Sequence, residues 1–152
     1  MRLLIANRGE IALRIIRTAR ELGIETVSVY AEDDASSPHV AAATESVPLG
    51  ASGASAYLDQ SALLKIAAET GATHVHPGYG FLSENAEFAQ ACTEAGIVFV
   101  GPDAQVLRTF GDKASARTAA VDSGVPVLPS TSANAGARRI SVARCSRSTC
   151  RS

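Results

Sequence analysis

Short apolar stretches and segments of helical period alternate along the chain from Arg2 to about Val127. Runs of apolar or β-branched residues predict strands, and apolar residues spaced three or four apart predict amphipathic helices. The predicted strands are 3–6, 24–30, 46–49, 73–76 and 97–100, and the predicted helices are 10–22, 40–43, 59–70, 84–95 and 112–121. Strands that alternate with helices indicate a parallel sheet. We therefore expect an α/β fold, with an open, Rossmann-like parallel sheet flanked by helices.

Capping residues support these boundaries. Asp59 and Asp112 stand where side chains cap helix starts, Ser83 is a candidate cap for the helix that follows it, and Pro102 suits the first turn of a further helix. Glycines able to adopt a positive φ follow three predicted helices, at Gly23, Gly71 and Gly96. On the first helix, the residues expected to face the core are Ile11, Ile15, Ile16, Ala19 and Leu22.

Composition narrows the class of protein. The chain has 152 residues, of which 46% are hydrophobic and 19% charged, so neither disorder nor a membrane protein is indicated. Its apolar runs are strand-sized, and its start does not resemble a signal peptide. Three cysteines do not suit a disulfide framework, so we expect a cytoplasmic location. The net charge of −1 favours neither nucleic acid nor an anionic membrane as a partner.

The charge is unevenly distributed. Residues 1–136 carry nine basic and 15 acidic residues, a balance of −6, whereas residues 137–152 carry five arginines and no acid, a balance of +5. The last segment also holds two of the three cysteines and lacks periodicity. We therefore expect one domain over residues 1–130, and over residues 131–152 a tail that is either unstructured or the product of a reading-frame shift.

The loop after the fourth long strand is the strongest candidate for chemistry. It reads His76-Pro77-Gly78-Tyr79-Gly80-Phe81-Leu82-Ser83-Glu84-Asn85. Two glycines allow the backbone to approach a ligand closely, and an aromatic ring between them suits a flat group. Equally, the loop fits a sharp turn with Phe81 and Leu82 buried. The residues alone leave both interpretations open.

Other signals are weaker. Gly78-x-Gly80-x-x-Ser83 is a near match to the dinucleotide-binding fingerprint. Lys113, close to a helix start, fits either a solvated surface group or a phosphate contact. Arg17 and Glu21 lie four apart on the first helix, where they suit a solvated ion pair or a dimer contact. The histidines and cysteines show no metal-ligand spacing, and no catalytic residue is assigned.

Taken together, the motifs resemble the amino-terminal domain of biotin carboxylases, the family of acyl-CoA carboxylases, pyruvate carboxylase and urea carboxylase. The segments that carry the resemblance span about residues 1–130 and are Leu4–Ala12, His76–Asn85, Phe99–Pro102, Gly111–Lys113 and Gly124–Pro126.

The resemblance implies an ATP-dependent carbon–nitrogen ligase as the parent enzyme. ATP activates bicarbonate as carboxyphosphate, which carboxylates biotin on a carrier protein, with Mg²⁺ at the phosphates. It also implies that Lys113 reaches the nucleotide phosphates, that His76, Gly78, Tyr79 and Gly80 form the biotin-side loop, and that Arg17 and Glu21 lie on a dimer face. The implied partners are an ATP-grasp domain, a biotin carboxyl carrier protein, a carboxyltransferase and a second copy of the chain.

The resemblance stops after about Ser130, where the family continues into its ATP-grasp domain. The lysine and glycine-rich loop of that domain do not follow in this sequence. We therefore expect a fragment that is inactive alone and binds none of these cofactors tightly. Two alternatives remain open at this stage: a dinucleotide-binding Rossmann domain, and a non-catalytic dimerisation or interaction module.

Overall fold

A single parallel sheet organises the protein. The computed structural model describes residues 1–128. Its strands follow the order β3-β2-β1-β4-β5, and every neighbouring pair is parallel. The strands are β1 (Arg2–Ile5), β2 (Glu25–Tyr30), β3 (Glu45–Pro48), β4 (His74–His76) and β5 (Val98–Phe99). The sheet confirms the expected α/β class.

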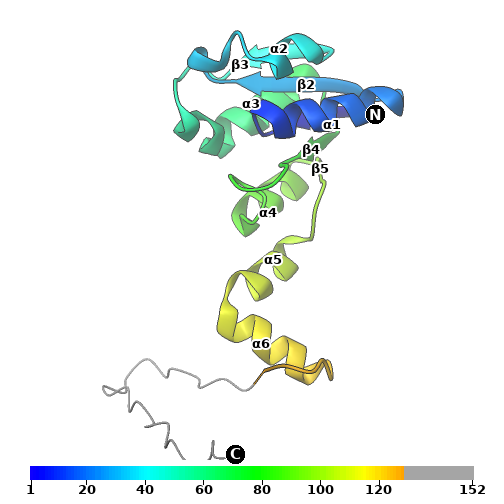
Figure 1. Cartoon of the computed structure of the whole chain (residues 1–152), viewed down its shortest axis with the longest axis vertical. Coiled ribbons are helices and arrows are strands. Elements are labelled where there is room, and N and C mark those ends of the chain that lie inside the picture. Colours follow the sequence, from blue (N-terminus) through cyan, green and yellow to red (C-terminus); the bar gives the residue numbers. More distant parts are fainter. Residues whose placement is uncertain (129–152) are drawn as a thin grey trace, which may run out of the picture.

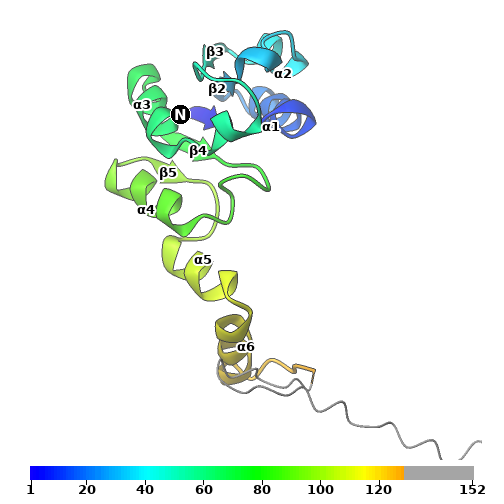
Figure 2. The same ribbon diagram turned by 90° about the vertical axis from the view of Figure 1, so that its left-hand side faces the viewer.

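Helices cover both faces of the sheet. They are α1 (Gly9–Glu21), α2 (Pro38–Ala42), α3 (Gln60–Thr70), α4 (Ala86–Glu94), α5 (Ala104–Gly111) and α6 (Lys113–Asp122), with short 3₁₀ turns η1 (Glu32–Asp34) and η2 (Ala54–Leu58). Figure 2 shows α1 and α2 on one side of the strands, with α3 and α4 on the other. The two 3₁₀ turns are absent from the sequence prediction, which places the other described elements within a few residues.

The core lies in two clusters, one on each face of the sheet. Side chains alternate along a strand, so neighbouring residues of β1 enter different clusters. Leu3 and Ile5 pack with Ala12, Ile16 and Ala19 of α1. The larger cluster forms on the opposite face, where its most deeply buried members include Leu4, Val27, Val29, Tyr57, Leu63, Val75, Phe88 and Cys92.

Leu22 is an exception to the predicted core. Its side chain is 69% exposed, so the expectation that it faces the core is wrong. Helix α1 ends at Glu21, and Leu22 forms the C-cap beside an open hollow rather than beneath another element. Ile15 is only partly buried, at the edge of the α1 cluster.

Aspartate or asparagine side chains cap the starts of α3, α4, α5 and α6. Asp59 and Asp112 accept hydrogen bonds from the amides of Ala62 and Ser115, as the sequence predicts. The cap of α4 is Asn85, whose Oδ1 accepts from Phe88 N at 2.8 Å, so the expectation for Ser83 is wrong. Likewise, α5 is capped by Asp103, and Pro102 precedes the helix instead of standing in its first turn.

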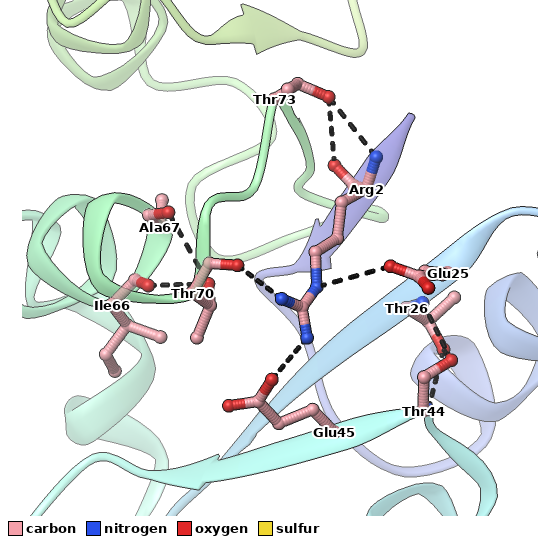
Figure 3. Close-up of polar contacts among 9 residues, drawn as sticks. All are labelled: Arg2, Glu25, Thr26, Thr44, Glu45, Ile66, Ala67, Thr70 and Thr73. Atoms are coloured by element: carbon pink, nitrogen blue, oxygen red, sulfur yellow. Dashed lines mark hydrogen bonds and ion pairs between the residues drawn. The ribbon is translucent and has the colours of Figure 1, made fainter.

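Arg2, at the amino-terminal end of β1, connects this strand to β2, β3 and α3 (Figure 3). Its guanidinium donates to Glu45 on β3 and, at 2.6 Å, to the carbonyl of Thr70 at the end of α3, and Nε lies 3.8 Å from Glu25 on β2. A cation at a helix carboxyl end is favourable because it meets the negative end of the helix dipole.

The last two helices leave the body of the domain. Figures 1 and 2 show α5 and α6 extending away from the sheet, and neither helix contains a buried residue. Apolar side chains on them are exposed, among them Val106, Phe110 and Val121. Within residues 1–128, no helix has the length and apolar character that a membrane span requires. The predicted tail, 131–152, lies outside the described residues.

Candidate functional site

The strand order places two loops side by side. From β1 the chain moves outward through β2 to β3, then returns to add β4 on the other side of β1. This reversal is a topological switch point, and ligands of open α/β sheets bind at the carboxyl ends of the strands there. The loop after β1 holds Asn7 and Arg8, and the loop after β4 holds Gly78 and Tyr79. The loop after β1 therefore lies against the loop after β4.

The loop after β4 has an unusual backbone. Gly78 and Gly80 have φ values of 69° and 65°, and Phe81, which is not a glycine, has a φ of 45°. A left-handed conformation in a large side chain costs about 1–3 kcal/mol and persists only where the surroundings enforce it. Such strain is concentrated at functional sites, which favours the ligand-loop interpretation.

His76 supports this loop from the end of β4. Its Nδ1 accepts a hydrogen bond from the amide of Gly78 at 3.0 Å, and burial lowers the pKa of its imidazole. A neutral ring is required for this acceptor role, because a protonated histidine has no free nitrogen lone pair. His76 is therefore a support of the loop, and the lowered pKa keeps it in the form that the loop needs.

Tyr79 projects from the loop. It is 70% exposed, although large aromatic residues usually bury most of their surface. It lines a hollow of about 430 Å³ together with His76, Gly78 and residues of α1, among them Ile11, Arg14 and Ile15. The walls are predominantly apolar, so the arrangement suits a flat, largely apolar group placed against the ring. Phe81 and Leu82 point the other way, into the core.

A buried polar cluster fixes the loop after β1. Asp34 of η1 accepts from Arg8 at 2.6 Å and from the Tyr57 hydroxyl at 2.8 Å, while that hydroxyl accepts from Ala31 N. Burial by itself would raise the pKa of Asp34, but the hydrogen bonds from Tyr57 and Arg8 outweigh it and lower the pKa. Burial raises the pKa of Tyr57 to about 12. The cluster therefore holds one fixed anion and one fixed cation at the carboxyl edge of the sheet.

Lys113 lies apart from Tyr79. It is the first residue of α6, directly after the cap Asp112, and it is exposed. It does not line the hollow at Tyr79, and α6 extends away from the sheet in both views (Figures 1 and 2). Of the residues predicted for the site, His76, Gly78 and Tyr79 line this hollow, whereas Gly80 and Lys113 do not.

Arg17 and Glu21 are both exposed on α1. The ion pairs formed within residues 1–128 do not include one between them, so the suggested pair is not formed. The same helix presents Arg14, Thr18 and Leu22 to the hollow beside Tyr79.

No metal centre is apparent in the described part of the chain. Within residues 1–128, no group of three or more His, Cys, Asp or Glu side chains lies close enough to hold a metal ion. Cys92 is fully buried, and burial raises the pKa of its thiol to about 11, which suits the predicted role of a small core residue.

The glycines of the loop do not lead into a helix as a dinucleotide fingerprint requires. That motif places its last glycine at the helix start, whereas Ser83 here lies in a turn and α4 begins at Ala86. The dinucleotide alternative is therefore not favoured.

Known proteins resemble this chain over most of its described length. A family model described as the biotin carboxylase, N-terminal domain, matches residues 1–107. The biotin-dependent acyl-coenzyme A carboxylase alpha3 subunit of Mycobacterium leprae is 50% identical over 131 residues, which are 86% of this chain and 22% of that protein. Mitochondrial pyruvate carboxylase of Rattus norvegicus is 50% identical over 132 residues, 86% of this chain and 11% of its own length.

Solved structures agree. The biotin carboxylase domain of a single-chain bacterial carboxylase superposes with a TM-score of 0.83 at 60% identity, covering 88% of this chain and 31% of that one. The chain thus spans less than a third of each of these relatives. Because the family model covers well over half of its residues, the chain belongs to the biotin carboxylase N-terminal domain family.

Proposed function

We propose that this chain forms the biotin-facing wall of a biotin carboxylase active site and acts as part of a larger biotin-dependent carboxylase. The observation that carries the proposal is the loop after β4, which presents Tyr79 at the switch point of the sheet. This loop lies within the segment that the family model matches. The M. leprae and rat relatives extend far beyond the matched segment, which leaves room for the rest of the site.

In this proposal, Tyr79 and Gly80 lie beside biotin, and His76 and Gly78 hold them there. The ring of Tyr79 offers a flat apolar surface to the fused rings of biotin. The positive φ of Gly80 and the open space beside its Cα let a ligand approach the backbone closely. On this wall, the proposed contact with biotin is therefore made by an aromatic ring and by the backbone.

The parent reaction couples two steps. Bicarbonate attacks the terminal phosphorus of ATP, releasing ADP and forming carboxyphosphate. The carboxyl group then passes to the ureido nitrogen of biotin, with release of phosphate and of the proton that this nitrogen carried. When bound, Mg²⁺ shields the phosphate charges. The described residues offer no group of ligands for it, so the proposal assigns the metal, and the residues that handle bicarbonate, to the ATP-grasp domain of the parent.

Lys113 is assigned to the nucleotide phosphates. An exposed lysine at the first position of α6 carries a mobile point charge. Since α5 and α6 bury none of their residues here, the proposal has them pack against the ATP-grasp domain, which brings Lys113 to the phosphates. Arg17 and Glu21, on the exposed side of α1, are assigned to a homodimer contact.

The remaining partners follow from the parent reaction. A biotin carboxyl carrier protein brings biotin to the wall formed by this chain, and a carboxyltransferase takes the carboxyl group onward. The proposed location is the cytoplasm. Alone, the 152-residue chain is expected to show no bicarbonate-dependent ATP cleavage, because one wall does not preorganise the transition state.

A graft tests the proposal. Residues 1–128 replace the matching segment of the biotin carboxylase domain from the single-chain bacterial carboxylase, which is 60% identical. The expected result is ATP cleavage that depends on both bicarbonate and biotin, at a rate within about tenfold of the unaltered domain. A folded chimera that lacks biotin-dependent cleavage, while the unaltered domain retains it, would contradict the proposal.

A further inference from the structure

The side chain of Asn7 connects the two loops at the switch point. It lies two residues after Ile5, the last residue of β1, and it is 2% exposed. Its Nδ2 donates to the carbonyl oxygen of Pro77 at 2.7 Å and to that of Tyr79 at 3.0 Å. Its Oδ1 accepts from the amide of Arg8 at 2.9 Å. Both amide hydrogens and the oxygen are therefore used, and two of the three bonds bracket Gly78.

Those two bonds support a loop whose backbone is strained. Gly78, Gly80 and Phe81 all have positive φ values within four residues. Phe81 is supported by the ring of Tyr57, with centroids 5.6 Å apart, and Gly78 by its bond to His76. The side-chain amide of Asn7 holds the carbonyl oxygens of Pro77 and Tyr79. The loop is thus tied at successive points to side chains from three other segments.

The fit between Asn7 and Gly78 is steric as well as polar. A Cβ built on Gly78 would lie 2.6 Å from Nδ2 of Asn7 and 2.9 Å from Cγ2 of Ile11. The same addition at Gly80, whose φ is similar, meets open space. Only a glycine at position 78 allows Asn7 to reach both carbonyls.

We propose that Asn7 is a positioning residue that sets the conformation of the Gly78–Phe81 loop and so the direction in which Tyr79 projects. That Tyr79 meets biotin rests on the proposed function, whereas the geometric part of the inference does not. Asn7 touches no reacting group and acts through the two backbone carbonyls.

The test is amide hydrogen exchange in the 152-residue chain, followed by NMR. Asn7→Asp keeps the size of the side chain and its acceptor for Arg8 but removes both donors. The carbonyls of Pro77 and Tyr79 then lose the donor that holds them, which loosens the loop. Exchange of the Gly78 and Ser83 amides, which bond within the loop, is expected to accelerate at least about tenfold relative to that of Leu4 and Val75 in the core.

Asn85→Asp is the matched control. It makes the same charge change on the other flank of the loop, but Asn85 acts only as an acceptor in its bonds with Phe88 and Gln60. In this variant, exchange of the Gly78 and Ser83 amides should stay within about twofold of the rate in the unaltered chain. Equal acceleration in loop and core for Asn7→Asp, or no acceleration, would overturn the proposal.

A second readout needs no variant of Asn7. In the unaltered chain, the side-chain amide protons of Asn7 should exchange slowly with solvent. Gly78→Ala should abolish that protection, while Gly80→Ala, which suffers a similar backbone strain without the collision, should retain it. Rapid exchange of these protons in the unaltered chain would overturn the proposal even if Asn7→Asp does not fold. Neither hydrogen-exchange experiment uses biotin. A failure of this inference is therefore distinguishable from a failure of the proposed function, which the graft tests.

Discussion

His39 is a buried histidine that makes no hydrogen bond. It is 0% exposed, and neither ring nitrogen has a partner. Burial lowers the pKa of its imidazole and the charge of Arg8 acts in the same direction, while the carboxylate of Asp34 and the backbone of Val29 offset this only in part. The folded protein therefore resists a proton that the unfolded chain accepts near pH 6.5.

We predict that acid destabilises the fold through this residue. Below about pH 6.5 the unfolded state binds more protons than the folded state, so the free energy of unfolding decreases as the pH falls. His76, whose pKa is also lowered, adds to the slope. Urea unfolding between pH 5 and pH 7.5 checks this.

The control is His39→Gln, which cannot titrate and should show a shallower dependence on pH than the unaltered chain. If both proteins lose stability equally as the pH falls, the assignment of the effect to His39 is wrong.

Single residues were predictable where their role is local. The glycines of the 78–80 loop stand out in the sequence because positive φ is a property of residue type. Asn7, Asp34 and Tyr57 were not found, because their partners are far away along the chain: Asn7 bonds to residues about 70 positions later. A polar residue directly after a buried strand was the available signal, and it does not reveal which strand lies beside it.

At the scale of elements, the sequence prediction and the structure differ over which residue caps α4. Asn85 accepts the capping hydrogen bond from Phe88, whereas the Ser83 hydroxyl caps nothing. Loss of a cap costs about 0.5–2 kcal/mol, and surface changes away from such features stay within about 0.5 kcal/mol. We predict that Asn85→Ala lowers the free energy of unfolding by about 1 kcal/mol and that Ser83→Ala changes it by less than half as much. Chemical denaturation of both variants measures these changes. A larger loss of stability from Ser83→Ala than from Asn85→Ala would identify Ser83 as the cap.

The order of elements was largely predictable, since each strand and helix has its own period of apolar residues. The order of the strands in the sheet was not predictable, because no local feature of β4 indicates that it pairs with β1 rather than with β3. The site at the switch point follows from that order. This is why the sequence indicated the loop after β4 as a candidate without showing that it touches the loop after β1.

At the scale of the whole molecule, the protein has an incompletely covered surface. Phe110 on α5 is 61% exposed, while Phe88 on α4 is 0% exposed. In the proposed parent enzyme, the exposed ring is covered by the ATP-grasp domain. The two phenylalanines thus provide a matched comparison between a residue of the domain core and a residue of a proposed interface.

We predict that Phe88→Ala destabilises the 152-residue chain by about 3–5 kcal/mol, as expected for a buried aromatic residue. Phe110→Ala should change its stability by less than about 0.5 kcal/mol, yet destabilise the chimera described above, where the ring is buried. Thermal unfolding of the two proteins with each change checks this. A large loss from Phe110→Ala in the chain alone would show that α5 already packs within it.

The central claim is that one chain contributes to both the biotin side and the nucleotide side of a single active site. The most direct test measures the KM for biotin and the KM for ATP in variants of the chimera. Tyr79→Ala is predicted to raise the KM for biotin about two- to tenfold and leave the KM for ATP within about twofold, because a lost aromatic contact is worth about 0.5–1.5 kcal/mol. Lys113→Ala is predicted to do the opposite, raising the KM for ATP about tenfold or more, because a charge-assisted bond to phosphate is worth about 1.5–3 kcal/mol. Lys65→Ala, on the far helix α3, is the control and should change neither value. If Tyr79→Ala leaves the KM for biotin unchanged while the chimera remains active, the account is contradicted.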